Sequence, residues 1–349
     1  MFLKQNELEK LSEEFLWLKQ EIFNSESVIT KADFPCVFGV QGYKRQLHYV
    51  SALNYPYDSK ELSNDIEKYL KELDSLDSKE SGLSGLLVYF QPLGNMSIKA
   101  KQFLSWRVLS EMKNKFGGVN DNIDSDPKQD NYSFKFKDEL WFINFSSNSY
   151  LHRDSRNLKS FLILALQTFN RSNTYFKANN TIKAKAQKTV RTLAEKFDGC
   201  PVHSGLGPII GSEKFSPVKL SYYIGDTNEE PSFQPWLYEE FSPDKIVIDG
   251  NILKNVEMLN EFNQFNQLKK PFELLLLDES ENNLYINSLS KSELLKYDAP
   301  NILFVSEKQD NLSEYKGGIS SCLIGKNNKS SKTNYFHIEH FNDLLALYK

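Results

Sequence analysis

The chain has 349 residues, of which 40% are hydrophobic, 25% charged and 13% aromatic, and its formal net charge is -4. This composition excludes a disordered chain, and the acidic balance argues against binding nucleic acid mainly through charge. The longest apolar runs, residues 161–166 and 274–277, are far shorter than the roughly 20 residues that cross a bilayer. Three widely spaced cysteines suit a reducing compartment, and charges interleaved through residues 1–24 exclude a signal peptide. We therefore expect a cytoplasmic protein of mixed α/β structure.

Helices dominate the expected structure of the first part of the chain. Apolar residues recur every three or four positions in residues 8–22, which predicts an amphipathic helix. A second helix is predicted over residues 59–73, with Ser59 as its N-cap. A buried strand over residues 86–90 and a helix over residues 98–116 follow.

The middle of the chain combines strands, helices and an irregular segment. Residues 132–137 and 140–145 predict two antiparallel strands. Residues 157–169 are apolar on most of their surface and are interpreted as a buried helix. Residues 181–197 predict a basic, exposed helix. Residues 199–217 are rich in glycine and proline and are expected to be irregular.

The last third of the chain changes in character from about residue 242. Short apolar runs alternate there with helical or turn segments, which predicts a small parallel α/β domain. The runs are residues 245–250, 272–277, 301–305 and 321–325. Residues 231–243 carry three prolines and mark the boundary. The expected fold is an α+β N-terminal domain over residues 1–240 with a smaller α/β C-terminal domain over residues 241–349.

The five histidines are the first candidates for chemistry. His337 and His340 are three residues apart beside Glu339, a spacing that invites a metal site. No third ligand at a recognised spacing accompanies them, so a surface helix end is the favoured interpretation. His48 lies in an aromatic, strand-like run and is interpreted as a packed residue.

The segment around His152 is more specific. We expect it at a strand-to-helix transition, where Asp154 or Ser155 caps the helix. Arg153 and Arg156 would then gather carboxylates or other anions, helped by the positive end of the helix. The alternative is a helix cap with solvated arginines.

Two further residues lie in turns. His203 stands in a segment of glycines and prolines, and loops of this kind often line a site. Cys36 follows Pro35, and a thiolate there could ligate a soft metal or haem iron. The alternative is a cysteine packed among aromatic neighbours. The motifs of P-loop, zinc-protease, α/β-hydrolase and dinucleotide-binding sites are absent from the sequence.

Taken in order, five stretches of the chain resemble the YqcI/YcgG family over about residues 31–235. The stretches are FPCVFG (34–39), LLVYFQP (86–92), FLSWRVL (103–109), HRDSRNL (152–158) and FDGCPVHSGLG (197–207). The FPC and H-x-x-x-R-N pieces are the most specific parts of the resemblance.

This resemblance implies a haem-dependent oxygenase that N-hydroxylates an amino acid or a related amine or guanidine, an arginine-like substrate included, in small-molecule biosynthesis. The implied cofactor is haem b, and the oxidant is dioxygen with an electron donor, or peroxide. Cys36, His152 and His203 are the alternative axial ligands of the iron. A thiolate favours O–O cleavage, which slightly favours Cys36, and an unused histidine could deliver protons.

The resemblance also implies roles for the polar residues near His152. Arg153 and Arg156, with Asn157 next to them, would hold the haem propionates or a substrate carboxylate. Asp154 or Asp198 would receive a cationic substrate.

The C-terminal region carries a second, weaker resemblance. Residues 246–253 resemble the first motif of haloacid-dehalogenase-type phosphatases, and residues 301–310 and 317–325 resemble the last. Val247 stands where that family has its nucleophilic aspartate, so we expect no phosphatase activity. We interpret this region as a degenerate or unrelated module for dimerisation or partner docking.

The same residues are also compatible with two other functions. One is a haem carrier or sensor without turnover, and the other is a non-haem scaffold in which Cys36 and His152 are packing residues. The expected partners are a small molecule and an oxidant, with neither nucleic acid nor membrane, and a homodimer is also open.

Overall fold

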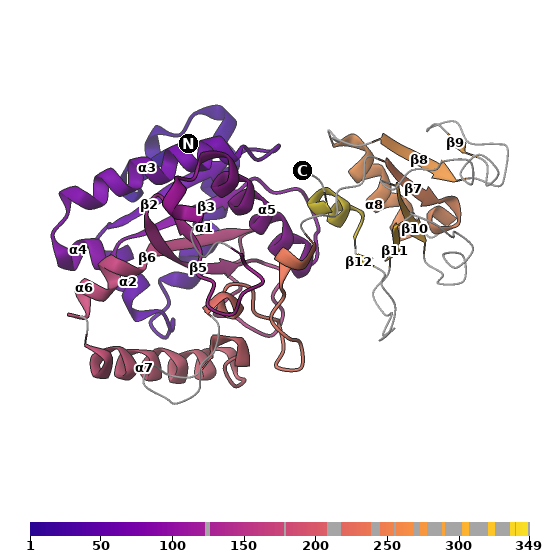
Figure 1. Cartoon of the computed structure of the whole chain (residues 1–349). Helices are drawn as coiled ribbons and strands as arrows, with labels where there is room; N and C mark the ends of the chain where they lie inside the picture. Colours follow the sequence, from indigo (N-terminus) through magenta and orange to yellow (C-terminus); the bar gives the residue numbers. More distant parts are fainter. Residues whose placement is uncertain are drawn as a thin grey trace. The chain divides into compact units, whose positions relative to one another are not determined.

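A computed structural model describes residues 1–122, 126–177, 179–207, 218–238, 245–254, 256–268, 273–277, 288–289, 302–306, 320–324, 336–338 and 340–347. The protein has mixed α/β structure and folds into two compact units (Figure 1). The first unit comprises Met1–Pro92 and Ser105–Leu237, and the second comprises Leu93–Leu104 and Tyr238–Lys349. The expected boundary at residue 240 lies outside the described residues. The assignment of Leu93–Leu104 to the second unit was not predicted.

The first unit is built on a six-stranded mixed sheet with the order β1-β2-β3-β6-β5-β4. Its strands are β1 (Phe2–Lys4), β2 (His48–Leu53), β3 (Gly85–Phe90), β4 (Lys135–Phe136), β5 (Glu139–Ser146) and β6 (Ile163–Thr168). The β2–β3 pair is parallel, with Val50 opposite Leu87, and the other four pairs are antiparallel.

Helices cover both faces of this sheet. The helices are α1 (Leu16–Ile29), α2 (Val37–Lys44), α3 (Ser59–Ser75), α4 (Ser78–Leu83), α5 (Ile98–Phe116), α6 (Phe169–Tyr175) and α7 (Asn180–Asp198). Leu18 and Ile22 of α1 pack with Val50 and Leu87, which lie on one face of the sheet. On the opposite face, the Tyr49 ring contacts Tyr69 of α3 at 5.4 Å, because neighbouring residues of a strand point to opposite faces.

Two expected helices differ from the structure. The helix predicted over residues 157–169 was wrong, because residues 163–168 form β6 between β3 and β5. A short run that is apolar at nearly every position does not distinguish a buried strand from a buried helix by its periodicity. Residues 8–22 do not form one helix either, because the chain is extended at Leu11 and Ser12 and α1 begins only at Leu16.

The second unit contains a parallel sheet, as the alternating pattern predicted, with the order β12-β11-β10-β7-β8-β9. Its strands are β7 (Lys245–Asp249), β8 (Glu273–Leu277), β9 (Ser288–Leu289), β10 (Ile302–Ser306), β11 (Ser320–Ile324) and β12 (Phe336–Ile338). The helix α8 (Val256–Gln267) and the 3₁₀ segment Phe341–Leu347 pack together through Phe262 and Phe341.

The predicted helix end at His337 and His340 was wrong. His337 belongs to strand β12, and His340 Nδ1 lies 3.0 Å from Glu261 Oε1 in α8. Among the helices that the structure describes, none combines the length and the apolar character needed to cross a bilayer.

Candidate functional site

The loop between β5 and β6 carries the H-x-x-x-R-N residues. It contains no helix, so the expected helix N-terminus at Asp154 and Ser155 was wrong. The loop folds back on itself instead, because Ser147 N–H donates to Arg156 O at 3.0 Å and Asn148 N–H donates to Ser160 O at 2.8 Å. The charged side chains of this loop therefore act without a helix dipole.

Arg153 holds this loop to the segments that follow α7. Its side chain is 2% exposed. Nε donates to Gly225 O at 3.1 Å, Nη1 to Pro201 O at 3.3 Å, and Nη2 to Asn228 Oδ1 at 2.6 Å. Together with the contact of Nη1 to Cys200 Sγ at 3.9 Å, these bonds use four of the five N–H donors, so Arg153 connects three segments of the chain and keeps no pair of N–H groups for a bidentate partner.

Arg156 is also buried, but only one of its three side-chain nitrogens donates hydrogen bonds to described residues. Its Nη1 donates to the Asn144 side chain and to Phe145 O, the latter at 3.3 Å. Nε and Nη2 donate no hydrogen bond to a described residue. Burial lowers the pKa of this guanidinium. A buried cation with unused donors is suited to bind a carboxylate.

Cys36 lies near Arg156, although the two residues are far apart in the sequence. It occupies the N-cap position of α2, where its side chain forms no capping hydrogen bond, although the Gly39 N–H acts on the thiol electrostatically. The residue is exposed at the surface and is a free cysteine. Desolvation by the surrounding protein raises the pKa of the thiol, and Gly39 N–H and the charge of Arg156 oppose this rise. The alternative of a cysteine packed among aromatic neighbours stays a prediction.

Asp198, at the end of α7, faces the same loop. Its carboxylate accepts hydrogen bonds from Ser155 N at 2.6 Å and from Ser155 Oγ at 2.8 Å. Burial raises the pKa of Asp198, while the bonds from Ser155 and the charges of Arg153 and Arg156 lower it. Asp198 therefore anchors the loop near both arginines.

His203 is held by backbone groups on both ring nitrogens. Nδ1 accepts from Gly205 N–H at 2.9 Å, so Nε2 carries the proton and donates to Glu230 O at 2.7 Å. The residue is 1% exposed, and burial lowers its pKa. Either nitrogen would have to give up a backbone partner to bind a metal.

The remaining candidates of the loop differ in exposure. His152 is exposed, and its imidazole forms no hydrogen bond with a described residue, whereas its backbone N–H donates to Asp226 Oδ1 at 2.9 Å. Asp154 is exposed as well. Asn157 is half-buried, and its Nδ2 donates to Tyr150 O at 2.6 Å, which gives it a role in the loop itself.

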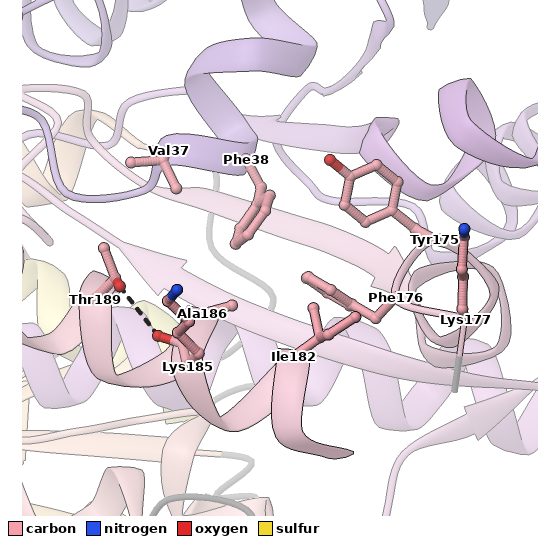
Figure 2. A pocket seen from close by; sticks show the side chains of 9 residues that line it. All are labelled: Val37, Phe38, Tyr175, Phe176, Lys177, Ile182, Lys185, Ala186 and Thr189. Carbon is pink, nitrogen blue, oxygen red and sulfur yellow. Dashed lines mark hydrogen bonds between the residues drawn. The ribbon is translucent and has the colours of Figure 1, made fainter. Parts of the chain in front are cut away.

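A hollow of about 460 Å³ lies between α2 and α7 (Figure 2). Two of the residues that line it, Val37 and Phe38, directly follow Cys36 in the sequence. Val37 and Phe38 enter it from α2, and the Phe38 ring meets Phe176 edge-on at 5.2 Å. The rest of its lining comes from the end of α6 and from α7, namely Tyr175, Lys177, Ile182, Lys185, Ala186 and Thr189. The hollow is mainly apolar, and Lys177 and Lys185 both contribute to its lining.

The sequence did not predict the hollow or the role of Asp226. Asp226 accepts the backbone N–H groups of Leu151 and His152 at 2.9 to 3.1 Å, and no local pattern marks it. The hollow had a signal in the sequence, because Ile182 and Ala186 are four residues apart on α7 and follow the aromatic pair Tyr175 and Phe176. Ile182 is 47% exposed in the structure.

Comparison with known proteins identifies the first unit. Residues 25–234, which hold Cys36, the 152–158 loop and His203, match the YqcI/YcgG family. The chain belongs to the YqcI/YcgG family. The match ends before Tyr238–Lys349, the larger part of the second unit, for which the haloacid-dehalogenase-like character stays a prediction. Neither the curated proteins nor the solved structures yielded a match to the chain.

The residues of this YqcI/YcgG chain fit the haem group that the resemblance implies. Haem needs an axial donor, an apolar cavity and cations for its propionates. Cys36 offers a free thiol, the hollow lined by the following residues Val37 and Phe38 is mainly apolar, and Arg156 offers a buried cation. Among the described residues no three His, Cys, Asp or Glu side chains gather as a metal cluster, and haem ligation requires no such cluster.

Proposed function

We propose that the protein is a haem-dependent oxygenase that N-hydroxylates an amino acid or a related amine or guanidine. The observation that carries this proposal is that the charge of Arg156 acts on the Cys36 thiol, which links the two most specific stretches of the YqcI/YcgG resemblance, and that Val37 and Phe38, which follow Cys36, line an apolar hollow. An axial donor, a cation and an apolar cavity are the three elements that a haem site needs.

The overall reaction balances with either oxidant. With dioxygen, R–NH₂, O₂, two electrons and two protons give R–NHOH and H₂O, so an electron donor is required. With peroxide, R–NH₂ and H₂O₂ give R–NHOH and H₂O. Bound haem would supply the activation of the O–O bond.

Cys36 is the proposed axial ligand. Desolvation raises the pKa of its thiol, and Gly39 N–H and the positive charge of Arg156 partly offset that rise in favour of the thiolate, which is the form that binds iron. His203 is a weaker candidate because both of its ring nitrogens have backbone partners. His152 is the alternative ligand or a proton donor, because its imidazole is exposed and has no described partner.

The polar residues of the 152–158 loop fall into two groups, those with side-chain groups free to bind a ligand and those whose side chains bond to the protein itself. Arg156 is the proposed partner of a carboxylate, either a haem propionate or the substrate, through Nε and Nη2. Asp154, which is exposed, is the proposed contact for a cationic substrate group. Arg153 and Asn157 position the loop, since their side chains donate hydrogen bonds to other residues of the protein.

The test is an absorption spectrum of the purified protein, as isolated and after addition of haem, and then reduced under carbon monoxide. We expect a Soret band whose position in the carbonyl complex indicates thiolate ligation. Cys36→Ala should lose the thiolate signature, and Cys200→Ala is the matched control because its thiol contacts Arg153 instead. Full haem content and turnover in both Cys36→Ala and His152→Ala would contradict the assigned site.

Other outcomes lead to the alternative functions. A Soret band without turnover of any amine, in the presence of reductant and dioxygen or of peroxide, would favour a haem carrier or sensor. A colourless protein that takes up no added haem would favour a non-haem scaffold.

A further inference from the structure

The region around α7 carries a concentration of positive charge that the proposed function does not use. Residues 168–194 contain no aspartate or glutamate, although the chain as a whole has a net charge of -4. The basic residues of this stretch are Arg171, Lys177, Lys183, Lys185, Lys188 and Arg191. A positive patch on an acidic protein is a local feature that favours an acidic partner.

Two of these side chains are already used within the protein. Arg171 forms an ion pair with Asp74 at 2.5 Å. Arg191 donates to the carbonyl oxygens of Leu206 and Gly207 at 2.8 and 2.7 Å. The other four residues form what we call the lysine face: Lys177, Lys183, Lys185 and Lys188.

The lysine face has no internal counter-charge. None of its four ammonium groups forms an ion pair or hydrogen bond with a described residue. Lys177, Lys185 and Lys188 are exposed, and Lys183 is half-buried. Lys185 and Lys188 are three residues apart on α7 and repel one another, so an anionic partner that covers them gains energy from both.

The lysine face borders the hollow. Lys177 and Lys185 are among the residues that line it (Figure 2). Lys188 follows Lys185 within one turn of α7. In Figure 1, α7 runs along the edge of the first unit and presents its length to the surroundings. A partner seated here would approach the hollow closely.

We propose that the lysine face is the docking surface for an acidic protein that donates electrons to the cofactor. This inference rests on the proposed function, because oxygenation with dioxygen requires two electrons from a donor. An acidic iron–sulfur or flavin protein has the charge to bind here and the redox group to supply them. Two molecules of a reduced one-electron donor would be oxidised for each nitrogen that is hydroxylated.

A protein partner is favoured over a nucleic acid by the composition of the lysine face. Its unpaired cations are all lysines, whereas planar arginine groups are better suited to phosphate recognition. The overall net charge of -4 also opposes an extended polyanion, whose charge continues beyond the helix.

The test measures binding of the full chain to an acidic plant-type [2Fe–2S] ferredoxin by calorimetry at low and high ionic strength. The variant is Lys183→Glu/Lys188→Glu, since neither residue lines the hollow. The control is Lys60→Glu/Lys71→Glu, which makes the same change in net charge on exposed positions of α3. We expect the α7 variant to weaken binding at least about tenfold at low salt and the control to change it less than about twofold.

The outcomes separate this inference from the proposed function. Equal weakening by both variants, binding that salt does not affect, or no binding by the unaltered chain would overturn the docking surface. Tighter binding of a single-stranded oligonucleotide that the α7 variant loses would also overturn it. Haem-loaded protein without ferredoxin binding contradicts the docking surface alone, whereas lysine-dependent binding by a protein that takes up no haem contradicts the oxygenase alone.

Discussion

Arg156 and Cys36 affect each other's ionisation, although they come from different ends of the first unit's sequence. Burial raises the pKa of the Cys36 thiol, and the positive charge of Arg156 acts against that rise. In return, a thiolate at Cys36 would favour the charged form of Arg156, whose pKa burial lowers. Each residue therefore stabilises the charged form of the other.

This pairing predicts the reactivity of the thiol. Arg156→Gln should raise the pKa of Cys36, so that alkylation by iodoacetamide at mildly alkaline pH becomes slower. Arg156→Lys keeps the positive charge and serves as the control, with a rate nearer that of the unaltered protein. The rate is measured on the Cys36 peptide by mass spectrometry across a pH series. Identical rates in all three proteins would show that the charge of Arg156 does not reach the thiol.

Arg153 should matter for stability more than for chemistry. Arg153→Met removes the donors of Gly225 O, Pro201 O and Asn228 Oδ1 from a buried position. We expect a loss of about 3 kcal/mol in the free energy of unfolding, because buried polar groups lose their partners. Urea unfolding measures it, and exposed Lys60→Met should change stability by less than about 0.5 kcal/mol. A loss no larger than that of the control would contradict the anchoring role.

His48 predicts a dependence of stability on pH. Burial lowers its pKa from 6.5 to about 4, and its Nδ1 has no partner in the described structure. Between these values the unfolded chain binds a proton that the folded chain does not, so stability should fall as the pH drops from 6.5 to 4. The contribution over this window is about 3 kcal/mol.

The measurement for His48 is urea unfolding of the unaltered protein and of His48→Gln at pH 7 and pH 4.5. The variant should lose less stability between the two pH values than the unaltered protein, because glutamine does not titrate. Equal losses in the two proteins would assign the acid sensitivity to other groups.

Gly42 provides a prediction in which two effects oppose each other. It lies inside α2, where alanine is favoured over glycine by about 1 kcal/mol. A Cβ there would lie 2.4 Å from Leu83 O and 2.6 Å from His48 Nε2. We expect Gly42→Ala to destabilise the protein by about 1 to 3 kcal/mol, because overpacking outweighs helix propensity.

Thermal unfolding decides the sign of the Gly42 effect. Gly118→Ala is the control, since its added Cβ would meet only Asp121 Oδ2, at an ordinary 3.7 Å. A Gly42→Ala protein that melts at or above the temperature of the unaltered protein would show that the contacts near Leu83 relax freely.

Sequence patterns predicted the elements whose periodicity is strong. The strand at residues 86–90 and the helix at residues 98–116 appear as β3 and α5 with nearly the expected bounds. The strand at residues 163–168 was misassigned because it is central in the sheet and its first four residues belong to the wholly apolar run 161–166, so no polar face reveals its period there. The predicted N-cap at Ser59 shifted by one residue, to Asp58, whose carboxylate accepts from Lys60 N–H.

The sequence could predict which residues belong to the candidate site, but not which partners each of them has. The sequence singled out Cys36, Arg153 and Arg156, but nothing local distinguishes the two arginines. Their difference arises from long-range partners, since all three nitrogens of Arg153 donate to distant residues such as Gly225 and Asn228, whereas only Nη1 of Arg156 donates a hydrogen bond to a described residue. Such partners come together only when distant loops fold, which no local pattern records.

The segment Leu93–Leu104 has a consequence for the order in which the protein is made. Ser97 N–H donates to Asp343 Oδ1 at 2.7 Å, a partner 246 residues later in the chain. During translation, this segment leaves the ribosome long before Asp343 is synthesised, and the second unit is completed only near the end of synthesis. Leu93, Met96 and Phe103 are buried in the finished protein, so the nascent chain carries these apolar side chains without their final neighbours for most of its synthesis. That interval is when a chaperone has the most to bind on this protein.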